Sequence, residues 1–224
     1  MEIWLRSDLL RVMNGNLAHL HTTESPHALR SSAMRYIVPS VLTALCLLAT
    51  GAGAHPHMFI DVRAKFMLTD TSLSGVHLYW DFDEMNSAVF IEEFDRNRNN
   101  RFESDEITAI EQGAFAAAAA SNYFTAITWD TKGLKIRTVD RFSAGIRPNK
   151  QVRYSFFIPC TILLDDIIDK DITVSFEDPS MFVAFTLVKD MIQVGGTDRV
   201  SGTIRFGKAD YLEHVILTIS RSEP

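Results

Sequence analysis

The sequence predicts an α+β fold, an antiparallel β-sandwich or layered sheet with an inserted EF-hand-like helix-loop-helix. Two segments, 57–68 and 75–83, alternate apolar and polar residues with a period of two, as half-buried strands do. Segments with helical spacing then flank a polar stretch, 95–106, that has the length of a calcium loop. Alternating segments resume afterwards, with no internal repeat and no linker, so we expect a single domain.

The first quarter of the chain has the pattern of a secretory leader rather than of a folded core. Arg35 precedes an apolar run that is shorter than the roughly 20 residues needed to cross a bilayer. The run ends in the small residues Ala52-Gly53-Ala54, which is typical of a signal-peptide cleavage site. The alternative is an extended signal or a membrane anchor that is retained uncleaved.

This leader sets the expected division of the chain. We expect cleavage after Ala54, and we expect Met34 to be the true start. The segments are then 1–33 as a non-native upstream extension, 34–54 as the signal peptide and 55–224 as the mature domain, with 84–121 as its EF-hand-like helix pair.

Composition excludes several classes of function. The 224 residues carry a net charge of −6 without a basic cluster, which argues against nucleic acid as a partner. Cys160 is the only cysteine after the leader, so the mature domain has no internal disulfide, and we expect this thiol to be buried. No phosphate-binding glycine loop, nucleophile elbow or zinc-protease motif is present, so we expect no enzymatic activity.

The remaining elements follow from periodicity and from turn residues. The first two strands form a hairpin around 69–72, and Met85, Ala88, Val89 and Phe94 give the entering helix 84–94 its apolar spacing. The exiting helix is predicted as one continuous helix over 104–121, because it contains an alanine run. Further strands are predicted at 124–129, 134–139, 151–158 (ended by Pro159), 172–177, 181–188, 200–206 and 214–219, with an acidic, irregular loop that contains a helical turn at 163–171.

The stretch 95–106 matches the ligand spacing of an EF-hand calcium loop. Side-chain oxygens stand at loop positions 1, 3, 5, 9 and 12, and position 7 offers a backbone carbonyl. The expected calcium ligands are Asp95, Asn97, Asn99, Arg101 (through its carbonyl), Glu103 and Glu106.

The composition of this loop predicts weak binding. Asn100 occupies the sharp turn where glycine is usual. Only three of the expected ligands are acidic, and three arginines within the loop would repel a cation. We expect a calcium affinity of roughly 10⁻⁴ to 10⁻³ M and a structural rather than a sensing role. The alternative is a polar connection between helices that binds no ion.

A second candidate metal site lies at the expected mature N-terminus. Cleavage after Ala54 would place a free amine beside the His55 ring, with His57 two residues further on. Amine and imidazole nitrogens suit zinc, nickel, cobalt or copper. The hairpin would bring Asp83 near His57, which makes His55, His57 and Asp83 a possible transition-metal site. The alternative is a frayed terminus with solvated histidines.

Several motifs together resemble one family. They are the opening 55–61, the segment 80–84, the loop 95–106, the segment 122–124 and the late segment 176–185. The combination is similar to the secreted bacterial proteins of domain of unknown function 1007. Members often carry aspartate at loop positions 3 and 5 and glycine at position 6, where this chain has Asn97, Asn99 and Asn100.

The resemblance implies a context rather than a chemistry. Family members are described as periplasmic components of uncharacterised ABC-type transport systems, often neighbours of or fused to nickel/cobalt efflux or zinc uptake proteins. It therefore implies a periplasmic accessory that binds or hands over a transition metal to a membrane transporter, either ABC-type or an efflux permease. The alternative is a calcium-stabilised protein-interaction module, and a weaker one is an enzyme with a copper-type N-terminal histidine site. The sequence does not indicate an oligomeric state.

Overall fold

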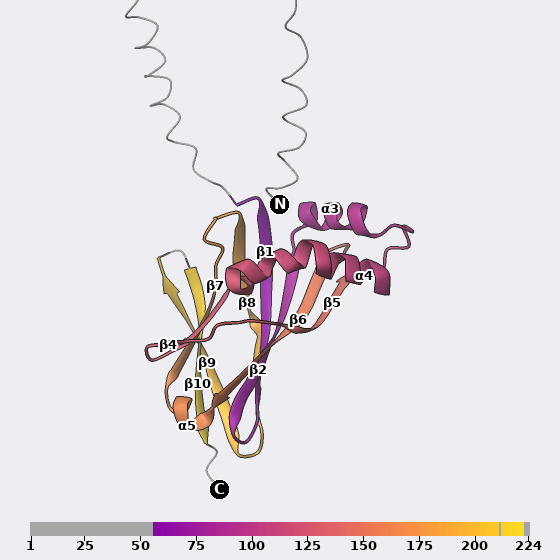
Figure 1. Cartoon of the computed structure of the whole chain (residues 1–224). Helices are drawn as coiled ribbons and strands as arrows, with labels where there is room; N and C mark the ends of the chain where they lie inside the picture. Colours follow the sequence, from indigo (N-terminus) through magenta and orange to yellow (C-terminus); the bar gives the residue numbers. More distant parts are fainter. Residues whose placement is uncertain (1–55, 211, 222–224) are drawn as a thin grey trace, which may run out of the picture. The chain divides into compact units, whose positions relative to one another are not determined.

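The computed structural model describes residues 56–210 and 212–221, which contain two five-stranded sheets (Figure 1). The first sheet contains, in spatial order, β5 (Asp140–Ile146), β6 (Val152–Leu163), β2 (Ser72–Phe82), β1 (Met58–Leu68) and β8 (Val183–Gly195). The second contains β4 (Lys132–Gly133), β3 (Thr125–Trp129), β7 (Asp171–Phe176), β10 (Leu212–Arg221) and β9 (Val200–Ala209). The arrangement is roughly a β-sandwich, as the alternation of the sequence predicts.

The β1–β2 hairpin is the predicted one, and it lies near the middle of the first sheet. Val62 pairs with Trp80 and Phe66 pairs with Val76, and all four side chains are buried. The alternating partners along both strands face outward, so the period of two correctly identifies the buried face.

The first sheet is mixed rather than wholly antiparallel, which corrects the sequence prediction. β8 runs parallel to β1, with Ile60 beside Phe185 and Val62 beside Leu187. Alternation within a strand reports burial but not direction, so the sequence offered no signal for this pairing.

β6 continues through Pro159 instead of ending there. The register between β2 and β6 shifts between Leu73 and Gly75, and Pro159 is paired at that irregularity. Because a bulge removes the need for a ladder donor, proline is tolerated at this position. The strand predicted at 134–139 is absent. The next strand along the chain, β5, begins at Asp140.

A side chain explains why 134–139 does not form a strand. Asn122 Oδ1 accepts a hydrogen bond from the Ile136 N–H at 2.8 Å, and Asn122 Nδ2 donates to the Thr125 carbonyl at 2.6 Å. Asn122, Tyr123 and Phe124 all have left-handed backbone conformations, with φ near +50°. Three consecutive non-glycine residues in that region are strained, and these two hydrogen bonds help to stabilise the turn.

The helical segment lies between β2 and β3, at the opposite end of the sheets from α5 (Leu164–Ile167) (Figure 1). It contains α3 (Glu84–Phe94), α4 (Ser104–Ile110), a π-helical turn η2 (Glu111–Phe115) and a 3₁₀ stretch η3 (Ala116–Phe124). The exiting segment predicted as one helix over 104–121 is helical, but its hydrogen bonding changes from α to π and then to 3₁₀ after α4, and the helical conformation ends at Ser121. No helix within the described residues has both the length and the apolar character needed to cross a membrane.

The buried face of α3 differs from the predicted one. Phe94 is buried as predicted, but the other predicted apolar positions, Met85, Ala88 and Val89, are exposed. Ser87 is buried in their place. The Ser87 hydroxyl accepts a hydrogen bond from the Val152 N–H at 2.9 Å and donates to the Phe82 carbonyl. A buried serine thus fixes α3 against β2 and β6, and apolar spacing alone cannot reveal that contact.

Replacing Asn122 tests how much the strained turn depends on its side chain. Asn122→Ala leaves the Ile136 N–H without its acceptor and removes a residue type that tolerates a left-handed conformation. We expect the free energy of unfolding in urea to fall by about 2 kcal/mol. The control Asn149→Ala, at an exposed turn, is expected to change stability little, and equal stability of the two variants would contradict this account.

Candidate functional site

The loop between α3 and α4 is closed by two buried carboxylates at its ends. Asp95, 4% exposed, accepts hydrogen bonds from the Asn99 and Asn100 N–H groups at 3.0 and 2.9 Å. Glu106, 2% exposed, accepts them from the Arg96 and Glu103 N–H groups at 2.8 and 2.9 Å. Glu106 therefore reaches across to the first residues of the loop, and Asp95 fixes the turn at its middle.

The backbone of the loop turns at Arg98 and Asn100, which have φ values of 57° and 60°. Asparagine is the non-glycine residue best suited to this conformation, so Asn100 can occupy the sharp turn. Its side-chain oxygen accepts a hydrogen bond from Lys150, in the connection between β5 and β6. Phe102 is buried in the core, which attaches the loop to the sandwich.

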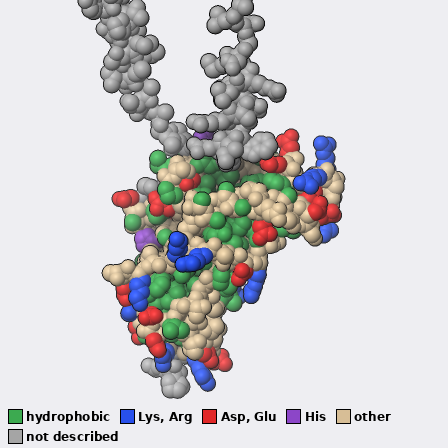
Figure 2. Space-filling view, viewed as in Figure 1, with side chains coloured by type: hydrophobic (Ala, Val, Ile, Leu, Met, Phe, Trp, Pro, Cys, Tyr) green, Lys and Arg blue, Asp and Glu red, His purple; other side chains and the backbone are tan. Residues whose placement is uncertain are grey.

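The middle ligand candidates form hydrogen bonds with one another. Asn97 and Asn99 donate from their amide nitrogens to the Glu103 carboxylate at 3.1 and 3.0 Å. Their amide oxygens accept the N–H groups of Asn99 and Arg101, respectively. Acidic and basic side chains gather over this loop in Figure 2, yet the described residues contain no group of three His, Cys, Asp or Glu side chains that could hold a metal ion.

The second predicted site is divided between described and undescribed residues. His55 lies outside the described residues. His57 is exposed, with its ring 5.3 Å from the Phe182 ring, and its carbonyl accepts a hydrogen bond from Asn86 Nδ2 at 3.0 Å. The same nitrogen donates to Asp83 Oδ2 at 2.8 Å, so Asn86 bridges the two predicted ligands.

The Asp83 carboxylate caps α3. It accepts hydrogen bonds from the Asn86 N–H at 2.9 Å and from the Phe59 N–H at 2.8 Å. Burial alone would raise the pKa of this carboxyl, but the hydrogen bonds from Asn86 and Phe59 outweigh it and hold the pKa below its usual range. Asp83 thus joins β1 to the start of the helix pair.

Asp81, two residues before Asp83, lies in a different environment from that cap. It is 3% exposed and pairs with Arg63, Arg147 and Arg153. Sequence reasoning missed this cluster because two of the arginines lie 66 and 72 residues away along the chain. The alternation of β1, β2 and β6 does place Arg63, Asp81 and Arg153 on the outer face of one sheet, which is the available signal.

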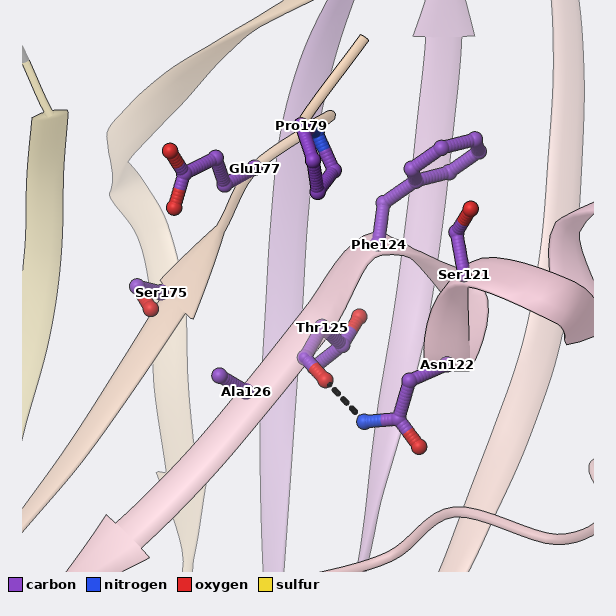
Figure 3. Close-up of a pocket in the computed structure, with 8 residues that line it drawn as sticks. All are labelled: Ser121, Asn122, Phe124, Thr125, Ala126, Ser175, Glu177 and Pro179. Atoms are coloured by element: carbon purple, nitrogen blue, oxygen red, sulfur yellow. Dashed lines mark hydrogen bonds between the residues drawn. The ribbon is translucent and has the colours of Figure 1, made fainter.

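A shallow pocket of about 200 Å³ lies beside the strained turn (Figure 3). Its lining residues come from η3, β3, β7 and the turn after β7: Ser121, Asn122, Phe124, Thr125, Ala126, Ser175, Glu177 and Pro179. Phe124 and Glu177 point away from each other in Figure 3, and the Asn122 amide is turned toward Thr125. The polar groups therefore do not converge as they do in a reaction centre.

Two comparisons relate the chain to known proteins. A family model described as "Protein of unknown function (DUF1007)" matches residues 40–202. An uncharacterised 15.5 kDa protein in the trpE 3′ region of Spirochaeta aurantia is 30% identical over 88 residues. That alignment covers 39% of this chain and 61% of the relative, so the chain spans less than two thirds of the relative's length.

Removing the α3 cap tests its structural role. Asp83→Ala is expected to lower the free energy of unfolding by about 1 kcal/mol, whereas Glu84→Ala in the exposed first turn is expected to change it much less. Because the folded pKa of Asp83 lies below that of an unfolded aspartate, its contribution is fully present above about pH 4 and is lost as pH falls through the folded pKa. The stability difference between the original protein and Asp83→Ala should therefore shrink with acidification, and a constant difference would contradict the assignment.

Proposed function

This chain belongs to the DUF1007 family, and we propose that it is a secreted, non-enzymatic accessory protein whose helix pair is stabilised by a calcium ion in loop 95–106. We place it in the periplasm, released by cleavage after Ala54, as an accessory to a membrane transporter of transition metals. The family resemblance and the leader pattern support this location and partner.

Burial of two charges in one loop carries the calcium proposal. Asp95 and Glu106 are almost fully buried, and no Lys, Arg or His nitrogen of the described residues lies within 4.0 Å of either carboxylate. Removing a carboxylate from water is costly unless a cation compensates it, and backbone N–H groups compensate only part of the charge. A calcium ion would supply the missing positive charge.

The available donors suit a hard cation. Carboxylate oxygens of Asp95, Glu103 and Glu106, amide oxygens of Asn97 and Asn99, and the Arg101 carbonyl are all oxygen ligands. Cation binding would turn Glu103 and the two asparagines from one another toward the ion, at the expense of the hydrogen bonds between them. That exchange is a further reason for weak affinity.

Thermal unfolding with and without calcium tests the loop. If the affinity is roughly 10⁻⁴ to 10⁻³ M, calcium at about 10 mM should stabilise the protein by about 1.5–3 kcal/mol and raise its melting temperature. Glu106→Gln should abolish that rise, and the adjacent exposed Asp105→Asn should retain it. An unchanged melting temperature in calcium would contradict the calcium proposal. Asp95 and Glu106 would then serve only as acceptors for the N–H groups of the loop.

A second role, binding or hand-over of zinc, nickel or cobalt, is supported by the exposed position of His57. Its ring lies at the surface, two residues from the amine that cleavage after Ala54 would create. His55 and that amine would complete a nitrogen donor set. Asp83 is the weakest of the three proposed ligands, because its oxygens accept hydrogen bonds from Asn86 and Phe59.

Calorimetric titration of the secreted protein, with its start at His55 verified by mass, tests this second role. We expect zinc, nickel or cobalt to bind more tightly than about 10 μM, since a donor set of two imidazoles and an amine is sufficient for that affinity. His57→Ala should weaken binding, and the matched variant His214→Ala should not. Binding weaker than this limit, or equal affinities in the two variants, would reject metal hand-over.

A further inference from the structure

A cluster of three arginines on the outer face of the first sheet has no part in the proposed function. Asp81, on β2, accepts hydrogen bonds from Arg63 Nε at 2.8 Å and from Arg147 Nη1 at 3.2 Å. Arg153 binds it in a bidentate manner, from Nε at 2.6 Å and from Nη2 at 2.7 Å. Since β2 lies between β1 and β6, Arg63 and Arg153 flank the carboxylate from its two neighbouring strands.

The cluster contains more positive charge than Asp81 needs. The bidentate pair with Arg153 already gives a buried carboxylate a strong partner, so Arg63 and Arg147 add like charges that repel one another. Three guanidinium groups beside one carboxylate leave two formal positive charges in excess. Burial would raise the pKa of Asp81, but Arg153 and Arg63 hold it below its usual range, so the carboxyl stays ionised and keeps the arginines in place.

Most donors of these arginines remain available. Each guanidinium has five N–H donors, and within the described part of the chain only those directed at Asp81 are engaged. The side chains of Arg63, Arg147 and Arg153 are 23%, 34% and 27% exposed, so an incoming ligand can reach their outer edges. Their partial burial lowers the cost of removing water when such a ligand binds.

The surrounding surface extends the positive field. The Arg153 guanidinium lies 5.6 Å from the Tyr79 ring, which stacks on His77, and Arg141 lies over Phe157. The His77 pKa is lowered by burial and also by the charges of Arg141 and Lys65. Across β5, β6, β2 and β1, with the adjoining Arg147 and Asp83, this face carries five basic side chains (Arg63, Lys65, Arg141, Arg147 and Arg153) and four acidic ones (Asp61, Asp81, Asp83 and Asp140). The excess is positive in a chain whose net charge is −6.

From this arrangement we infer that the three arginines around Asp81 form a binding site for a small oxyanion, of the carboxylate or phosphate type. Guanidinium groups match the spacing of two oxygens in either anion, and Asp81 fixes their orientation before the ligand arrives. The buried carboxylate serves to position the donors and does not contact the ligand. The site lies on a different element from loop 95–106, so neither proposal depends on the other.

Calorimetric titration of the purified protein at low ionic strength tests the site, with inorganic phosphate and succinate as separate probes. We expect saturable binding of at least one anion that weakens as sodium chloride is added, because surface charge is screened. Arg147→Gln should weaken it about tenfold or more, as expected for a lost charge-assisted contact, while Arg63 and Arg153 still pair with Asp81. Phosphate binding alone would assign a phosphate ligand, and succinate binding alone a carboxylate ligand.

Matched variants make the test decisive. Arg63→Gln provides an independent removal of one guanidinium if Arg147→Gln does not fold. Arg205→Gln, an exposed arginine that pairs with Asp171 on the second sheet, should bind the anion as the original protein does. No saturation by either probe below about 10 mM, or equal affinity in the cluster variants and the Arg205 control, would overturn the proposal.

Discussion

Packing of Phe115 onto the inner face of the first sheet is the interaction on which the placement of the helical segment and of loop 95–106 depends. Its ring centroid lies 4.9 Å from that of Phe156 and 4.3 Å from that of Phe142, with Trp80 at 6.1 Å. Aromatic pairs at these separations combine large apolar burial with defined geometry. This contact attaches the irregular helical segment to β2 and β6. It thereby holds α4, and with α4 the closing Glu106, at one end of the sandwich.

The buried carboxylates of this protein are stabilised in two different ways. Asp81 is surrounded by guanidinium groups and has more positive charge than it needs. Asp95 and Glu106 are equally buried, but among the residues that the structure describes they receive hydrogen bonds from backbone N–H groups alone. Since burying a charge is costly, the first environment suits an added anion and the second an added cation. The two proposed sites follow from this one contrast.

Local pattern predicted most of the strands and the helical segment, but it placed a strand at 134–139 in place of β5 and did not reveal the irregularities. The β1–β2 hairpin follows from periodicity, and the structure confirms it. Helices α3 and α4 lie on either side of loop 95–106, but the apolar spacing did not identify the buried face of α3. The left-handed turn at Asn122 and the absence of a strand at 134–139 both involve the hydrogen bond between Asn122 and Ile136, which are fourteen residues apart. In the same way, the arginines around Asp81 come from three separate segments, and only the pairing of β1, β2 and β6 brings them together.

The central claim is that loop 95–106 binds a cation through its buried ends. Hydrogen exchange of the Arg96, Asn99 and Asn100 amides, measured with and without calcium, tests it most directly, because these N–H groups bind the Asp95 and Glu106 carboxylates. We predict that calcium slows exchange at these amides and leaves the β2–β6 ladder less affected. Identical exchange rates with and without calcium would contradict it.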